Sequence, residues 1–291
     1  MNLRLVRYQA LGNDYLVVEG DAWRDWDRPE VTRRICDRHF GLGSDGILVR
    51  ATEDGATAER LRILNADGSE AEKSGNGLRI FARYLFDCAR VHEERFAVQT
   101  LGGTVLCQVS AAGADVAVEM GRVVFETAAI PLAREAIGDG GALDDQGRGG
   151  LRVAGQIREF QAASIGNPHC ALLVEQASEA EARDLGPLIE SHPLFPRKTN
   201  VQFLQVVDRR RIRLEIWERG SGYTLSSGSC ASAGAAIAKR LGFVGSEVVV
   251  EMRGGEARVT VAEAGEVTLR GPVARIASLD LASEFLRALA G

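Results

Sequence analysis

Two serine-glycine turns, each followed by a helical pattern, carry the residues best suited to chemistry. Ser74 opens "SGNGLRIFARYL" and Ser227 opens "SGSCASAGAAIA". The first amide groups of a helix have no partner within the helix, and the helix dipole places positive potential there, so such a start binds phosphate or carboxylate. If both starts contact one small anion, the two serines flank it. That arrangement can remove a proton from one face of a carbon and return one to the other.

A purely structural role for each serine is the alternative, because serine is among the preferred residues at a helix N-cap. Four short motifs bear on this choice, since they recur in the same order at offsets of 150 to 154 residues. The pairs are Gly12 in "GND" with Gly166 in "GNP", Ser74 with Ser227, Gly103 with Gly255, and Gly121 with Gly271. Chance matching of glycine-rich turns is the competing explanation, but the constant order and spacing favour an internal duplication.

The elements around these turns are mostly strands, with β-branched residues in alternating patterns at 3–12, 95–110, 114–121, 201–207, 212–220 and 246–271. Helical patterns cover about 29–39, 75–90, 178–189, 229–241 and 279–289. The segments after the two serines are apolar on most faces, which is typical of buried helices. We therefore expect an α+β fold of two pseudo-symmetric domains, each a curved, mostly antiparallel sheet wrapped around a central helix.

The domain limits follow from the same patterns. We expect one half at 1–126, with a C-terminal helix at 278–291 packing back on it, and a second half at 127–277. The glycine- and aspartate-rich stretch at 134–151 predicts a long surface loop or a link between the halves.

Composition excludes several classes of protein. The chain has 291 residues, 45% of them hydrophobic, and a net charge of −5, which argues against a protein that binds nucleic acid through its phosphates. No apolar run approaches the roughly 20 residues that span a bilayer, and the N-terminus lacks a signal-peptide pattern, so we expect a cytoplasmic protein. The five cysteines and four histidines are scattered, and we expect neither a disulfide nor a metal site.

At these residues the sequence resembles the pyridoxal-independent diaminopimelate epimerases. The matching motifs are "LGNDYLVVE", "CDRHFGLGSDG", "NADGSEAEKSGNGLRIFARYL", "IGNPHC", "KTNVQF" and "WERGSGYTLSSGSCASAGAA". They occur in the family's order from residue 11 to residue 236. The resemblance implies a cofactor-independent isomerase that converts LL- to meso-diaminopimelate in lysine biosynthesis. It also implies two pseudo-symmetric halves, a homodimer, and a carboxylate held between two helix N-termini.

The resemblance also assigns roles to individual residues. Ser74 and Ser227 occupy the two catalytic positions, and the amides of the next two residues of each helix receive the carboxylate at the reacting carbon. Arg219 suits a distal carboxylate and Glu218 an ammonium. The substrate-binding set is Asn13, Asn65, Gly75, Asn76, Asn167, Asn200, Glu218, Arg219, Gly228 and Ser229, with His169 and Tyr223 as candidate auxiliary residues. Turn formation for Asn13 and Asn65, surface ion pairing for Glu218 and Arg219, and a core position for His169 are the alternatives.

One departure from the family pattern matters for chemistry. The family motif has cysteine where this chain has Ser74 and Ser227, and glutamate where it has Tyr223. A thiol has a reference pKa near 8.5, whereas an alcohol is far less acidic. A gap of about five pKa units costs about 7 kcal/mol more to form the base, or several powers of ten in rate.

Three explanations of the serines remain open at this point. The chain is a diverged isomerase or racemase on another amino-acid-like substrate, or an epimerase whose two cysteines were exchanged to give an inert protein, or a non-catalytic amino-acid-binding homologue. Two routes are open to a diverged enzyme: it acts on a more acidic C–H bond, or it recruits another base, for which the candidates are Tyr223, His169, Asp67 and Cys230. In each case the expected partner is a small amino acid or dicarboxylate.

Overall fold

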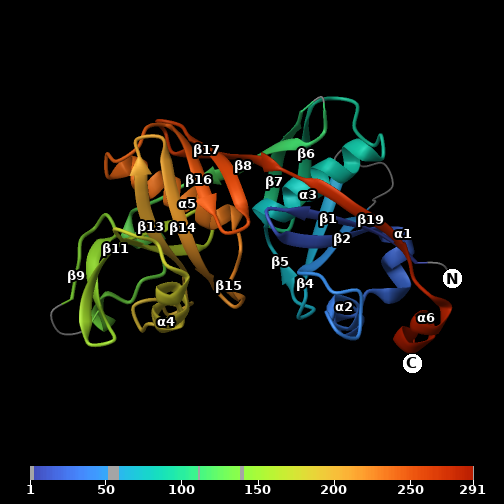
Figure 1. Cartoon of the computed structure of the whole chain (residues 1–291), viewed down its shortest axis with the longest axis horizontal. Helices are drawn as coiled ribbons and strands as arrows, with labels where there is room; N and C mark the ends of the chain where they lie inside the picture. Colours follow the sequence, from blue (N-terminus) through green and yellow to red (C-terminus); the bar gives the residue numbers. More distant parts are fainter. Residues whose placement is uncertain (1–2, 52–58, 111, 138–140, 291) are drawn as a thin grey trace. The chain divides into compact units, whose positions relative to one another are not determined.

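The computed structural model describes residues 3–51, 59–110, 112–137 and 141–290. The chain folds as two units, one made of residues 1–118 and 271–291 and the other of residues 119–270. Figure 1 shows the strands of each unit curving around one helix, α3 (Gly75–Asp87) in the first unit and α5 (Gly228–Arg240) in the second. Two strands, β8 (Asp115–Arg122) and β18 (Glu266–Pro272), contain the points where the chain passes from one unit to the other.

Of the described strands, the first unit contains eight in full and parts of β8 and β18, together with four α-helices and a 3-10 turn. Its strands are β1 Arg4–Ala10, β2 Asn13–Glu19, β3 Gly46–Ala51, β4 Glu59–Asn65, β5 Glu70–Ala71, β6 Arg95–Thr100, β7 Gly103–Val109, β8 Asp115–Arg122 and β19 Ala274–Asp280. Its helical segments are α1 Gly20–Trp23, η1 Arg24–Trp26, α2 Pro29–Cys36, α3 Gly75–Asp87 and α6 Ser283–Ala290.

The second unit repeats this series of elements. Its strands are β9 Ala142–Leu143, β10 Arg148–Val153, β11 Gln156–Ser164, β12 Pro168–Leu173, β13 Asn200–Asp208, β14 Arg211–Glu218, β15 Gly222–Tyr223, β16 Glu247–Met252, β17 Gly255–Val261 and β18 Glu266–Pro272. Its helical segments are η2 Thr127–Ala129, η3 Arg134–Ala136, α4 Glu179–Glu190 and α5 Gly228–Arg240.

Strand pairing shows the duplication directly. In the first unit β19, β1, β2, β3, β4, β6 and β7 are neighbours in that order, and the pairs β2–β3 and β4–β6 are parallel. In the second unit β10, β11, β12, β13, β14, β16 and β17 follow the same order, and the pairs β12–β13 and β14–β16 are parallel. The other pairs in both series are antiparallel. The expected α+β fold of two pseudo-symmetric halves is therefore confirmed.

The two central helices are buried because nearly every face of each is apolar or small. In α3 the side chains of Leu78, Phe81 and Leu85 are fully buried, and the helix packs against β1, β2 and β7. In α5 small residues replace these large ones, and the helix packs against β13, β14 and β17. A side chain on Gly234 would lie only 3.1 Å from Leu214 of β14, so this helix approaches its sheet closely.

Each unit also has an outer hydrophobic core beneath its covering helices. In the first unit Leu286 and Leu289 of α6 pack with Leu3, Leu16 and other strand residues, which fixes the C-terminal helix on this unit. In the second unit Ile189 of α4 packs with residues of β10 to β13. Within the described part of the chain, no helix combines the length and apolarity needed to cross a membrane.

Two local expectations differ from the structure. The C-terminal segment forms a helix only at Ser283–Ala290, because the preceding residues Ala274–Asp280 pair with β1 as an edge strand. That strand has little burial contrast between its faces, so alternation gave no signal. The predicted loop at 134–151 contains η3, β9 and the start of β10, and residues 138–140 of it lie outside the described residues. Glycine-rich composition concealed the strand there.

Gly186 of α4 provides a test of how closely this helix packs. A Cβ atom at this position would lie 2.6 Å from the Cβ and Cγ atoms of Trp217, which cannot move without shifting β14. Inside a helix, alanine in place of glycine normally raises the free energy of unfolding by about 1 kcal/mol. Overpacking lowers the free energy of unfolding by about 1–3 kcal/mol. Position 186 also precedes Pro187, where the helical backbone conformation is disfavoured for alanine.

We therefore expect Gly186→Ala to lower the free energy of unfolding by about 1–2 kcal/mol in urea titrations. Gly245→Ala is the matched control, since a Cβ there meets no atom within 4 Å. Its effect should stay within about 0.5 kcal/mol of zero. Equal stability of the two variants would show that Trp217 does not press against α4.

Candidate active site

Ser74 is the N-cap of α3. Its backbone is extended, with φ −140° and ψ 121°, and its Oγ accepts a hydrogen bond of 3.0 Å from the amide of Gly77. Glycine at position 77 permits this approach, because a Cβ there would lie 3.2 Å from the Ser74 side chain. The serine thus satisfies one amide of the first turn, and its hydroxyl lies at the helix start together with the amides of Gly75 and Asn76.

Ser227 caps α5 in the same way, with φ −143° and ψ 123°. Its Oγ accepts from the amide of Cys230 at 3.4 Å, a longer bond than at the first helix, and lies 3.4 Å from the Oγ of Ser229. Cys230 occupies the position that Gly77 has in α3. The N-cap role is therefore real for both serines, and it leaves each hydroxyl at a helix start where anions are stabilised.

In the first unit, Asn13 and Asn65 lie at one edge of the sheet. Strand register pairs Tyr15 with Gly46 and Gly46 with Asn65, so the start of β2 and the end of β4 flank the start of β3. The Asn65 side chain donates to the Oγ of Ser69 at 3.0 Å, which closes a local turn. Asn65 thus takes part in turn formation, which was the alternative to substrate binding. It lies at the same edge of the sheet as Asn13.

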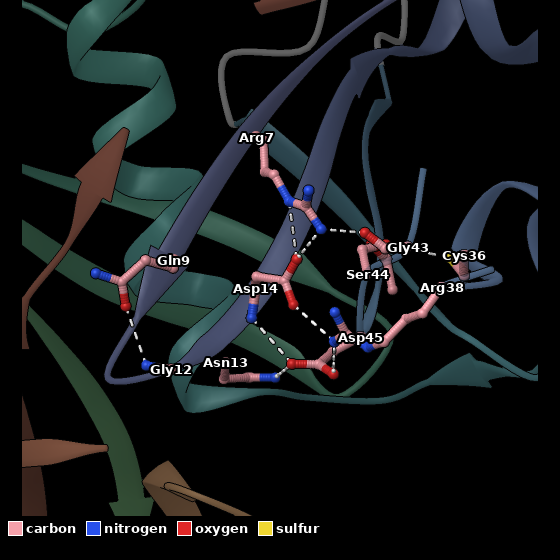
Figure 2. A network of polar contacts seen from close by, with 11 residues as sticks. Arg7, Gln9, Gly12, Asn13, Asp14, Cys36, Arg38, Gly43, Ser44 and Asp45 are labelled. Atoms are coloured by element: carbon pink, nitrogen blue, oxygen red, sulfur yellow. Dashed lines mark hydrogen bonds and ion pairs between the residues drawn. The ribbon is translucent and has the colours of Figure 1, made fainter. Parts of the chain in front are cut away.

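The Asn13 side chain is held by a charged network (Figure 2). Its Nδ2 donates to Asp45 at 2.7 Å, and the amide of Asp14 donates to the same carboxylate oxygen at 2.9 Å. Arg38 bridges Asp45 and Asp14 at 2.8 Å to each, and Arg7 holds the other oxygen of Asp14. Because Asp45 accepts the hydrogen bond from the side-chain Nδ2 of Asn13, the side-chain carbonyl oxygen of Asn13 is oriented to accept from another donor, such as an ammonium group.

In the second unit, His169 joins two side chains into a buried chain of hydrogen bonds. Its Nδ1 lies 2.7 Å from Nε2 of Gln202, and its Nε2 lies 2.8 Å from Oδ1 of Asn167. Burial, and next the positive charge of Arg219, lower the pKa of His169 to about 3. The ring is therefore neutral near pH 7, accepts from Gln202 and donates to Asn167. His169 is a core histidine with a satisfied ring, and it also orients Asn167.

Glu218 and Arg219 lie at the hairpin between β14 and β15, and buried polar groups hold this turn. Oδ1 of Asn200 accepts from the amide of Arg219 at 3.1 Å. Glu190, the last residue of α4, accepts from the indole of Trp217 at 2.8 Å and from the amide of Gly220 at 3.1 Å. These bonds fix the backbone on both sides of Glu218 and Arg219, so the turn is positioned by α4 and β13.

The polar residues of the second unit gather beside the start of α5. The negative charge of Glu218 acts on Cys230, which also has hydrogen-bonding contacts with Ser227, Ser229 and Gln202. Asn200 pairs across the sheet with His169 and is one residue from the Val201–Trp217 pair. The strand register gives the equivalent positions in the two units. Asn167 corresponds to Asn13, Asn200 to Gly46, and Glu218 to Asn65. Each duplicated half therefore presents a helix start and a polar sheet edge.

The four candidate replacement bases are poorly suited to that task. Burial, then the hydrogen bond to Glu215, raise the pKa of Tyr223 to about 12, and its hydroxyl donates to Glu215 at 2.6 Å. Burial, then the charge of Glu218, raise the pKa of Cys230. His169 has the low pKa given above, and hydrogen bonds from the Ser69 hydroxyl and amide lower the pKa of Asp67. None of the four is a good proton acceptor near pH 7.

Sequence reasoning missed the residues that support the site. Asp45, Gln202 and Glu190 act on Asn13, His169 and the β14–β15 turn, respectively. Their partners lie 27 to 33 residues away in sequence, so no local pattern signalled the contacts. Across the described residues there is also no group of three or more histidine, cysteine, aspartate or glutamate side chains able to hold a metal ion.

Comparison with known proteins identifies the family. The family described as diaminopimelate epimerase matches residues 5–126 and 161–276. The chain belongs to the diaminopimelate epimerase family. It is 44% identical to diaminopimelate epimerase 2 of Nostoc sp. over 97% of this chain and 96% of that protein. It is 39% identical to the diaminopimelate epimerase of Desulfitobacterium hafniense, over 94% and 96%.

Solved structures of related fold are more distant in sequence. A hydroxyproline epimerase from Agrobacterium vitis superposes with a TM-score of 0.66 at 15% identity, covering 97% of this chain and 93% of that one. A phenazine biosynthesis protein from Bacillus anthracis gives 0.66 at 14% identity, covering 97% and 99%. At this identity the likeness concerns the fold shared by members of the diaminopimelate epimerase family.

Glu190 makes the stability of the β14–β15 turn dependent on pH. Burial raises its pKa, but the bonds from Trp217, Gly220 and Lys198 outweigh burial and leave the pKa below its ordinary value. A carboxylate with a depressed folded pKa stabilises the fold above its unfolded pKa of about 4.3, and this contribution is lost as pH falls through the folded pKa.

We expect Glu190→Gln to lower the free energy of unfolding at pH 7 by about 1–3 kcal/mol, since bonds to a charged acceptor are weakened. The deficit should shrink as pH falls below about 4.3, which urea titrations at several pH values would show. Glu263→Gln, at an exposed ion pair with Lys239, is the control and should change little. A deficit independent of pH would contradict the ionised role of Glu190.

Proposed function

We propose that this chain is a cofactor-independent isomerase that removes and returns a proton at a carbon next to a carboxylate, on an amino-acid-type substrate such as diaminopimelate. The observation that carries the proposal is the duplicated helix start. Ser74 and Ser227 cap α3 and α5 with the same backbone conformation. They are also the two residues to which the family resemblance assigns the catalytic role. In the proposed reaction, backbone amides at such a helix start donate hydrogen bonds to the carboxylate of the substrate.

The remaining substrate groups are assigned to the polar residues of the two sheet edges. Asn13, oriented by Asp45, offers a carbonyl oxygen to an ammonium group, and Asn167 is oriented by His169. Arg219 suits the distal carboxylate, and its positive charge reaches the same region as His169. These charges favour a substrate with an amino group at one end and a second carboxylate at the other.

Proton transfer by the serines is the slow step of this proposal. Replacing a thiol by an alcohol costs about 7 kcal/mol if the two pKa values differ by about five units. A helix start stabilises a nearby anion by about 0.3–2 kcal/mol, so it recovers only part of that cost. The protein with serine at positions 74 and 227 should therefore bind the substrate well but exchange the proton on the substrate's reacting carbon slowly.

A second candidate, an amino-acid-binding protein without catalysis, is favoured by one observation. Tyr223, Cys230 and His169 have pKa values displaced away from neutrality in the direction that disfavours a base. Both candidates require the same ligand-binding groups. They differ only in whether a proton moves.

We also propose that the protein acts on a small amino acid or dicarboxylate in the cytoplasm, as a homodimer. The names of the relatives support an amino-acid substrate. The five cysteines are all free, and four of them are buried, which suits a reducing compartment. The dimer rests on the family resemblance, and light scattering at several concentrations measures it.

Deuterium exchange at Cα of diaminopimelate in heavy water separates the two candidates. We expect slow exchange by the chain as written, and a gain of at least about a thousandfold in Ser74→Cys/Ser227→Cys, because a thiol at a helix start is ionised far more readily. Ser178→Cys is the matched control. Ser178 also caps a helix, α4, but is not one of the proposed site residues. The rate of deuterium exchange catalysed by Ser178→Cys should therefore equal that of the unmodified protein.

Two other outcomes decide against the isomerase. Binding without exchange in both the native chain and the double cysteine variant supports the binding protein. Neither binding nor exchange in either one rejects diaminopimelate as the substrate. Isothermal calorimetry with meso-diaminopimelate supplies the binding half of this comparison.

A further inference from the structure

Arg79, in the second turn of α3, is a fully buried cation with incomplete pairing. Its side chain has no exposed surface. One guanidinium nitrogen donates to Oδ1 of Asn76 at 2.6 Å, and another to the carbonyl of Pro272 at 3.3 Å. The third, Nε, has no hydrogen-bond partner among the residues described. Within that same part of the chain, Arg79 forms no ion pair with a carboxylate.

This position is unfavourable for a cation on two counts. A buried charge that lacks a paired counter-ion costs several kcal/mol of desolvation. A positive charge near the N-terminus of a helix also opposes the helix dipole. Burial lowers the pKa of Arg79 to about 10, and the more distant charge of Asp115 acts in the opposite direction. The guanidinium is nevertheless charged at neutral pH, so the unliganded protein bears the cost.

Neighbouring positions show that the fold itself does not require this charge. Arg83, one turn further along α3, is paired with Asp87 at 2.7 Å. In the second unit the position equivalent to Arg79 is Ser232, an uncharged residue whose hydroxyl donates to the carbonyl of Gly228 at 2.8 Å. The two duplicated helix starts therefore differ in charge, and only the start of α3 has a buried cation behind it.

The contact with Asn76 connects this charge to the helix start. Asn76 is the second residue of α3 and only 3% exposed, and Arg79 fixes its side chain by holding the amide oxygen. An anion at the amides of Gly75 and Asn76 would supply the negative charge that Arg79 lacks. A helix start is a weak anion site alone, and a cation buried behind it strengthens the local positive potential.

We propose that Arg79 is a positioning residue that orients Asn76 and supplies positive potential for a carboxylate bound at the start of α3. This start is then the stronger carboxylate site of the two. The statement that this carboxylate belongs to an amino-acid substrate rests on the proposed function. The statement that a carboxylate binds at the start of α3 is independent of the proposed function.

The test compares Arg79→Met with Arg83→Met in the full chain labelled with 15N. Acetate is titrated while the amide signals of Gly75 and Asn76 are followed, and meso-diaminopimelate is titrated separately. Arg79→Met should weaken acetate binding at these amides about tenfold or more, as expected on loss of one nearby charge. Without ligand it should melt at the same temperature as the native chain or higher, because an uncompensated buried charge has been removed.

Arg83→Met should show the opposite pattern, a lower melting temperature with acetate affinity unchanged. Arg79→Lys keeps the charge and should keep acetate affinity within about threefold, and it remains informative if the methionine variant fails to fold. Unchanged acetate affinity in Arg79→Met overturns the proposal, as does a tenfold loss in Arg79→Lys. Acetate binding at α3 in a chain that does not bind diaminopimelate would reject the proposed substrate and leave the role of Arg79 standing.

Discussion

The helix that begins inside a curved sheet is the constraint on which this structure depends. Its first amides lie among residues that are largely buried, and each needs an acceptor. Ser74 and Ser227 supply one acceptor each, to Gly77 and Cys230. The other amides of the first turn have no partner within the helix and provide donors for an anion. The same constraint thus explains why serine stands at both caps and why both helix starts can bind a carboxylate.

Duplication places a polar sheet edge beside each helix start, but the two copies have diverged. In the first unit Asp45, itself paired with Arg38, holds Asn13. In the second unit His169, which is bonded to Gln202, holds Asn167. The first helix start has a buried arginine behind it and the second has a serine. Divergence has therefore changed the polar groups beside each helix start without changing the fold.

Stability and binding compete at several of these residues. Glu190 has lost most of its hydration but gains three hydrogen bonds, two of which hold the β14–β15 turn. Arg79 has lost its hydration and gains only two hydrogen bonds. Protein interiors rarely retain a charge with so little compensation unless the charge has a use. Glu190 is therefore a buried ion that stabilises the fold, whereas Arg79 is a buried ion whose missing counter-charge a bound anion would supply.

The sequence by itself determined the duplication, the fold class and both serine-capped helices, because these follow from local patterns and from motifs repeated at nearly constant spacing. In the structure Asn13 begins β2, Asn65 ends β4, and Gly75 and Gly228 begin α3 and α5. The helix expected at 279–289 overlaps the end of β19, since an edge strand with little burial contrast has no alternating pattern.

Only the tertiary structure decided which side chains support the site and which candidate bases are unsuitable. The contacts of Asp45, Gln202 and Glu190 join residues far apart in sequence, so pairing of strands had to bring them together. The pKa values of His169, Tyr223 and Cys230 depend first on burial. Burial is a property of the packed molecule and not of any segment, and for that reason the sequence could name these residues but not their protonation states.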